Sequence, residues 1–219
     1  MPFLFRRALL LVAAGVFAGM AISAQAAESL RYQKWEFSLM YRQQVGAIVT
    51  GPKGATVDFK DSGGAGLSFG YNPNDYLNVA FDLAFNSPRY VASFTDAGGN
   101  DRTIKRKSDF FTTQVNATLH LLPTKVTPFV SGGFGWAAID SNVSSGTGYC
   151  VPDYYWGWYC YQDSYRETNF TYNASVGLRA DIDEYTFVRA TYGRQYIDFS
   201  APSQNQDFAV IKFELGFKM

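Results

Sequence analysis

The chain lacks the features on which several classes of protein depend. Its 219 residues include one histidine, His120, and two cysteines, and its 19 basic residues balance its 19 acidic ones. A chain without net charge offers little electrostatic attraction to nucleic acid, so nucleic acid is not an expected partner. The glycine-rich stretches Gly132–Gly135 and Ser62–Gly64 lack the Lys-Ser/Thr pair of a phosphate-binding loop. We therefore expect neither a nucleotide site nor any other cofactor or metal.

The first 26 residues are expected to be a cleavable signal peptide. Arg6 and Arg7 form a short basic region, the run from Ala8 to Ile22 is apolar and uncharged, and small residues end in an A-x-A pattern at Ala26. A transmembrane anchor is the alternative, but a helical span needs roughly 20 apolar residues. After residue 26 no run approaches that length, which excludes a helical membrane protein and leaves residues 27–219 as the mature domain.

Eight segments of the mature sequence alternate apolar and polar residues, which predicts amphipathic β-strands. They are Trp35–Gln44, Ala65–Tyr71, Leu77–Asn86, Phe110–Leu121, Phe129–Ile139, Asn169–Ala180, Thr186–Tyr196 and Asp207–Met219. Most have about the 9–11 residues that a tilted strand needs to cross a bilayer. The strands of a soluble sandwich alternate in the same way, so this pattern alone does not separate the two architectures.

The lengths of the links between these segments do separate them. Short and long links alternate along the chain: the short ones are Asn72–Asp75, Leu122–Thr127 and Asp181–Glu184, and the long ones are Gly46–Gly64, Ser87–Asp109, Asp140–Thr168 and Ile197–Gln206. Such alternation is typical of transmembrane barrels with short periplasmic turns and long external loops. A spanning sheet must also close, because an open edge in hydrocarbon leaves backbone groups unsatisfied. We expect an all-β fold, an eight-stranded antiparallel transmembrane barrel with both termini in the periplasm.

The polar faces of the strands predict a lumen filled by side chains. The charged residues on these faces are Glu36, Arg42, Asp82, Arg179, Arg189, Lys212, Glu214 and Lys218. Because an unpaired buried charge is costly, we expect them to form a paired network that plugs the barrel. Glu214 is its expected centre, with Arg189 and Lys212 as nearest partners; a gated ion path is the alternative. His120 is expected in the lumen on the periplasmic side, with its hydrogen bonds satisfied.

Two cysteines lie in the third long link. Cys150 and Cys160 belong to an exported chain, and export to an oxidising compartment favours a disulfide between them. A metal site is the alternative, but it would need more ligands than this segment offers. The expected disulfide closes a loop and is not needed to hold the barrel together.

The long links also carry two groups of candidate interaction residues. The aromatic group is Tyr154, Tyr155, Trp156 and Trp158, and the basic group is Arg102, Lys105, Arg106 and Lys107. Exposed aromatic clusters often mark interaction sites, although packing of the rings on the barrel rim or at the lipid headgroups is the alternative. The basic group is a candidate for contacts with lipopolysaccharide phosphates, with a solvated charged loop as the alternative.

Three segments resemble a known family. Thr127–Gly135 resembles the "P-aromatic-V-x-x-G-x-G" strand of the OmpA-like small outer-membrane β-barrels, and Phe187–Tyr192 resembles their "L-R-x-x-Y" strand. The last strand resembles the outer-membrane assembly signal, except that it ends in Met219, with Phe217 two residues before it. The resemblance implies a location in the outer membrane of a Gram-negative bacterium. It also implies assembly by the barrel assembly machinery and contact with lipopolysaccharide.

The expected function is non-enzymatic, in envelope integrity and in surface interaction through the external loops with an unidentified ligand. The alternative is a narrow porin-like channel for small or hydrophobic solutes, as in OmpW-like relatives. A lipid-modifying outer-membrane enzyme is a remote alternative. Such enzymes resemble one another in using a catalytic histidine near the outer leaflet or the cell exterior, whereas His120 is expected at the periplasmic side.

Overall fold

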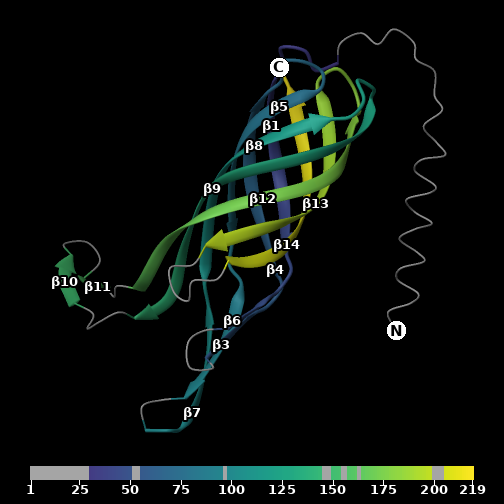
Figure 1. Ribbon diagram of the computed structural model, residues 1–219. Coiled ribbons are helices and arrows are strands. Elements are labelled where there is room, and N and C mark those ends of the chain that lie inside the picture. The colour runs from purple at the N-terminus through teal and green to yellow at the C-terminus, as the bar shows by residue number, and fades with distance from the viewer. Residues whose placement is uncertain are drawn as a thin grey trace, which may run out of the picture.

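The computed structural model describes residues 30–50, 55–95, 98–144, 149–153, 157–161, 164–198 and 205–219 (Figure 1). The segment predicted as a signal peptide, residues 1–26, lies outside the described residues. Within the described part of the chain, no helix is long and apolar enough to cross a membrane.

Eight antiparallel strands close into a barrel. They are β1 (Trp35–Gln44), β4 (Ser62–Tyr71), β5 (Leu77–Asn86), β8 (Asp109–His120), β9 (Val126–Ser144), β12 (Ser164–Asp181), β13 (Thr186–Asp198) and β14 (Asn205–Lys218). The order around the barrel is β1-β14-β13-β12-β9-β8-β5-β4. The last strand pairs with the first from Glu36↔Lys218 to Gln44↔Val210, which leaves no open edge. The predicted all-β, eight-stranded antiparallel barrel is confirmed.

The alternation of side chains sorts the two faces of the barrel wall. On the outside, Leu39, Phe81 and Trp136 are 51%, 46% and 56% exposed. Their inward neighbours Met40 and Asp82 are 4% and 8% exposed. A continuous exterior of exposed apolar side chains requires a non-aqueous surrounding, which agrees with the lipid-facing surface expected from the sequence.

Small inward residues make room for large ones. Phe187 on β13 lies directly opposite Gly216 on β14, and a Cβ atom added at Gly216 would lie 2.1 Å from the Phe187 ring. Phe129 covers Gly177 in the same way across β9 and β12, where an added Cβ would lie 2.5 Å from the ring. Glycine at these two positions therefore lets an aromatic ring lie flat against the inner wall.

Short turns and both ends of the barrel sequence meet at one end, the short-turn end. Met219 and Trp35 exchange two backbone hydrogen bonds of 2.9 and 2.8 Å there. In the turn between β12 and β13, the Asp183 carboxylate accepts hydrogen bonds from the backbone N–H groups of Tyr185 and Thr186. Because these donors favour the ionised carboxylate, they hold the pKa of Asp183 below its ordinary value.

The opposite end, the long-loop end, carries additional strands. The strands β2 (Ile48–Thr50), β3 (Thr56–Phe59), β6 (Arg89–Thr95) and β7 (Asp101–Lys107) form a four-stranded sheet in the order β2-β3-β6-β7, and β10 (Tyr149–Asp153) pairs with β11 (Gly157–Tyr161). Figure 1 shows this sheet extending away from the barrel. The sequence pattern predicts these segments only as links between barrel strands. The sheet forms because β3 of one link pairs with β6 of the next, which no local pattern reveals.

Candidate functional site

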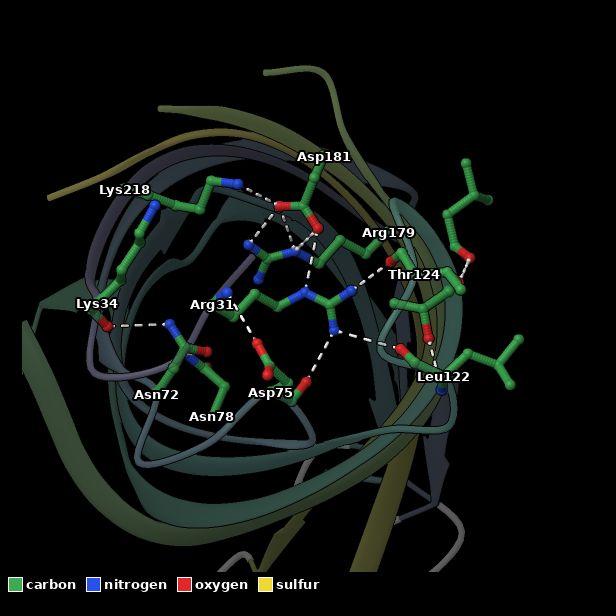
Figure 2. Close-up of polar contacts among 12 residues, drawn as sticks. Arg31, Lys34, Asn72, Asp75, Asn78, Leu122, Thr124, Arg179, Asp181 and Lys218 are labelled. Carbon is green, nitrogen blue, oxygen red and sulfur yellow. Dashed lines mark hydrogen bonds and ion pairs between the residues drawn. The ribbon is translucent and has the colours of Figure 1, made fainter. Parts of the chain in front are cut away.

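Asp181 is the centre of an ion cluster inside the short-turn end (Figure 2). Its carboxylate accepts from Arg31 Nε at 3.1 Å, Arg179 Nη2 at 2.8 Å and Lys218 Nζ at 2.9 Å. None of these four side chains is exposed. Three cations around one carboxylate leave an excess of positive charge, so the cluster needs a second acid.

Glu36 is that second acid. Its two carboxylate oxygens lie 2.7 Å from Arg179 Nη2 and 2.8 Å from Arg189 Nη2. Asn78 Nδ2 also donates to it at 3.3 Å. Arg179 therefore joins Glu36 and Asp181 into one network, here called the ionic plug: Arg31, Glu36, Arg179, Asp181, Arg189 and Lys218.

An aromatic ring separates two of the cations in the ionic plug. Arg179 and Arg189 are direct cross-strand partners on β12 and β13, a position where like charges repel. The Phe187 ring lies against both, with guanidinium carbons 4.1 and 4.7 Å from its centroid. Cation–π attraction, worth roughly 2 kcal/mol when desolvated, together with the shared Glu36 offsets the repulsion.

Arg31 seals the short-turn end. Besides Asp181, its guanidinium donates to the backbone carbonyls of Asp75 at 2.9 Å, Leu122 at 3.5 Å and Thr124 at 2.5 Å. These acceptors belong to the β4–β5 and β8–β9 turns, so one side chain ties the turns together across the lumen, as Figure 2 shows. Arg31 carries no signal in the sequence pattern because it precedes the first alternating segment, and Asp181 carries none because it falls in a predicted turn.

The middle of the lumen holds smaller ion pairs. Lys212 Nζ lies 3.2 Å from Asp82, which also accepts from Asn116 Nδ2 at 2.9 Å. Glu214 accepts from Ser38 Oγ at 3.1 Å and lies 3.7 Å from Arg189 Nε. The network is thus centred on Glu36 and Asp181. The prediction that Glu214 is its centre is wrong. Lys212 does not pair with Glu214, because its long side chain reaches across the lumen to β5, a strand not adjacent to β14.

Two small cavities remain between these groups. One of about 20 Å³ is lined by residues including Arg42 and Thr112, and one of about 10 Å³ by residues including Arg189 and Glu214. Asp82 and Lys212 line both, so their ion pair separates the two. A cavity needs roughly 10–15 Å³ to hold one water molecule. Each cavity therefore leaves room for about one water molecule between the side chains that line it.

Arg42 on β1 lies directly opposite Lys212 on β14. It is 4% exposed, and its Nη2 donates to the side-chain oxygens of Gln44 and Gln195. Within the described residues no carboxylate lies within ion-pair distance of it, so it stands apart from the ionic plug.

An apolar cluster closes the lumen at the long-loop end. Phe59 of β3 contacts Phe110 and Phe208 of the barrel, with ring centroids 5.8 and 5.9 Å away, and Tyr90 of β6 at 5.8 Å. Ile139, Ile197 and Val210 pack into the same cluster, here called the aromatic cap. The signal in the sequence is that Phe110 and Phe208 occupy inward register positions on otherwise polar strand faces. The loop contribution from Phe59 had no such signal.

His120 lies buried at the short-turn end, as its position before a short turn suggested. Its ring packs against Phe129 at 5.9 Å between centroids. Neither ring nitrogen has a hydrogen-bond partner in the described part of the protein, so the expectation of satisfied hydrogen bonds is wrong. No group of three His, Cys, Asp or Glu residues suited to a metal occurs among the described residues.

The predicted loop residues lie beyond the barrel. Arg102, Lys105, Arg106 and Lys107 are exposed on β7, with Lys105 and Lys107 on one face of that strand. The backbone register places Cys150 directly opposite Cys160 in the β10–β11 hairpin. Tyr154, Tyr155 and Trp156 lie outside the described residues, as do the side chains of Trp158 and both cysteines.

A closed barrel with an apolar exterior and paired charges inside is the architecture of a transmembrane β-barrel. Residues 11–218 match the family described as "Outer membrane protein beta-barrel domain", and the chain belongs to this family. The protein is therefore located in the outer membrane of a Gram-negative bacterium.

The chain is similar to several solved structures at low sequence identity. The outer membrane protein OprG from Pseudomonas aeruginosa superposes with a TM-score of 0.53 at 10% identity, covering 88% of this chain and 99% of that chain. The N-terminal β-barrel domain of Pseudomonas aeruginosa OprF gives 0.48 at 16% identity, covering 86% and 98%. Neisserial surface protein A gives 0.49 at 11% identity, covering 85% and 96%. No curated protein matches the chain in sequence.

Proposed function

We propose that this protein is a non-enzymatic, non-conducting outer-membrane barrel that acts through its external loops and contributes to envelope integrity. The observation that carries the proposal is the closure of the lumen at both ends, by the ionic plug and by the aromatic cap. In this proposal the short turns face the periplasm and the long-loop end faces the exterior, as in other outer-membrane barrels. Two barriers in series leave the lumen as a packed interior rather than a path for solutes.

The position of the only histidine supports the absence of catalysis in this proposal. His120 is buried beside Phe129 at the short-turn end, out of reach of a substrate at the outer leaflet. The proposal assigns surface interaction instead to the four-stranded sheet and the β10–β11 hairpin, which extend beyond the barrel.

Planar-bilayer recording of the refolded wild-type protein tests the proposal. We expect no steady single-channel conductance, because each end of the lumen is closed. A wild type that conducts steadily would overturn the structural function and favour the narrow channel.

The basic strand β7 is proposed to contact lipopolysaccharide phosphates. Arg89 and Lys107 are exposed, direct cross-strand partners, so their like charges repel until an anion binds between them. Lys105 shares the same face of the sheet. We expect the double substitution Lys105→Ala and Lys107→Ala to weaken binding of lipopolysaccharide to the micelle-bound protein. The control is Lys125→Ala, an exposed lysine at the short-turn end, and equal binding by both variants would contradict the proposal.

A further inference from the structure

The lumen carries more positive than negative charge. Among the described residues its cations are Arg31, Arg42, Arg179, Arg189, Lys212 and Lys218, and its carboxylates are Glu36, Asp82, Asp181 and Glu214. Every one of these cations except Arg42 has a carboxylate oxygen within 3.2 Å. Arg42 is thus the one of these cations without an ion pair, and Asp82, which pairs with Lys212, is the carboxylate that acts on it electrostatically.

The Arg42 guanidinium is buried with part of its hydrogen-bonding capacity unused. Only Nη2 has partners, the amide oxygens of Gln44 and Gln195, and the buried Nε has none. Lys212, a second cation, lies directly opposite on β14. An arginine cannot lose its proton in a protein, so this charge is not removed by neutralisation. Leaving it uncompensated in a poorly hydrated lumen is costly.

The 20 Å³ cavity adjoins this group and is polar where it meets Arg42. Lys212, Gln114 and Thr112 also line it, as does Asp82, whose carboxylate is paired with Lys212. The Thr112 hydroxyl is buried without a partner. Its volume of about 20 Å³ is enough for a particle about the size of one water molecule. A water molecule would satisfy the hydrogen bonds but not the charge.

We propose that this cavity is a binding site for a small inorganic monoanion, chloride in the cell envelope. Arg42 supplies the countercharge, Lys212 adds to the positive potential, and the Thr112 hydroxyl donates a hydrogen bond to the ion. The anion then halves the excess positive charge of the barrel interior, at a position between the ionic plug and the aromatic cap. This site is independent of the proposed loop function.

Anomalous diffraction from wild-type crystals soaked in bromide tests the site directly. We expect a bromide peak in contact with the Arg42 guanidinium inside the barrel, and no peak there in Arg42→Met. Wild-type density that shows only water at this position, or bromide only on the outer surface, would overturn the proposal.

A solution measurement uses stability as a second readout. Urea unfolding of the refolded protein in micelles is followed while chloride replaces gluconate, which is too large for the cavity, at constant ionic strength. Near saturation, each tenfold increase in chloride should raise the ratio of folded to unfolded wild type about tenfold. Arg42→Met should lose this dependence, and Arg166→Met, which removes an exposed arginine, should keep it. A wild type insensitive to chloride would contradict the site. If Arg42→Met does not fold, bromide diffraction and chloride-dependent unfolding of the wild type still test whether the site binds an anion.

Discussion

Single carboxylates hold several cations together in the ionic plug. Glu36 is shared by Arg179 and Arg189, whereas Glu214 has one ion pair, a longer one of 3.7 Å. Removing one partner of a buried pair is more damaging than the pair is stabilising, because the remaining charge stays buried without compensation. The free energy of unfolding that is lost when an acid is removed should therefore increase with the number of cations that pair with it.

Glu36→Ala is expected to lower the free energy of unfolding by about 3–5 kcal/mol, the usual cost of breaking a buried ion pair. Glu214→Ala should cost clearly less. Urea unfolding in micelles measures both, with Glu167→Ala, an exposed acid on β12, as the control. An equal loss for the two buried acids would show that the plug is not centred on Glu36.

At the residue scale, the sequence predicts which side chains point inward but not which ones pair. Period-two alternation alone assigns Glu36, Arg179 and Arg189 to the inner face, where the structure places them. The choice of partner depends on contacts across the lumen, such as Lys212 on β14 with Asp82 on β5. Those contacts depend on barrel closure and strand tilt, which neither residue specifies locally.

At the scale of elements, each barrel strand has one face for lipid and one for the lumen. Most strand bounds follow the alternating segments closely, because a buried face fixes the register of a strand. The strands β9 and β12 extend further than predicted at the long-loop end, to Ser144 and from Ser164, in segments that the sequence assigned to a long link. The strands of the loop sheet are shorter and were missed. The pattern in β7 is dominated by charge, and its partner strand β6 belongs to a sheet built from two separate links.

Phe81→Arg tests the assignment of faces. Phe81 lies on the outer face of β5, where arginine near the membrane midplane costs about 2–4 kcal/mol. We expect the variant to lose heat-modifiable mobility on a gel or to unfold at lower urea. Phe94→Arg, on the loop sheet, should behave like wild type, and tolerance of arginine at Phe81 would mean that this position does not face lipid.

The β10–β11 hairpin gives the predicted disulfide a structural context. Antiparallel partners lie within about 4.5–5.5 Å between Cα atoms, a separation that suits a disulfide, and Cys150 is the direct partner of Cys160. Purified protein should therefore show no thiol labelling by mass spectrometry until it is reduced. The barrel should remain folded after reduction, because the bond closes only a loop. Labelling of both cysteines in unreduced protein would refute the disulfide.

At the scale of the whole molecule, two chemically different clusters occupy the two ends of the lumen. The ionic plug is built by the strands and short turns, and the aromatic cap requires the loop sheet for Phe59 and Tyr90. The sequence predicts that polar and charged side chains fill the lumen, but it does not predict the apolar cluster at the long-loop end. The apolar closure comes from a loop residue that enters the barrel mouth, a contact between distant segments.

Phe59→Ala tests whether the barriers act in series. Removing this ring opens the aromatic cap, but the ionic plug remains, so we expect single-channel conductance to stay at the wild-type level. Phe94→Ala on the exposed part of the loop sheet is the control. A rise in conductance for Phe59→Ala alone would show that the aromatic cap is the effective barrier.

The hydrogen bonds of Arg31 have a kinetic consequence. Its acceptors lie in two short turns and on Asp181 at a third, so its contacts form only after the strands that those turns connect are in place. Interactions absent from the transition state for folding affect the unfolding rate and leave the folding rate nearly unchanged. Arg31→Met should therefore accelerate unfolding in a urea jump while refolding into micelles proceeds at the wild-type rate. A slower refolding rate would mean that the turns assemble around Arg31 early in folding. Refolding at the wild-type rate would show that Arg31 acts only after the barrel has formed, by setting how long the folded barrel persists before it unfolds.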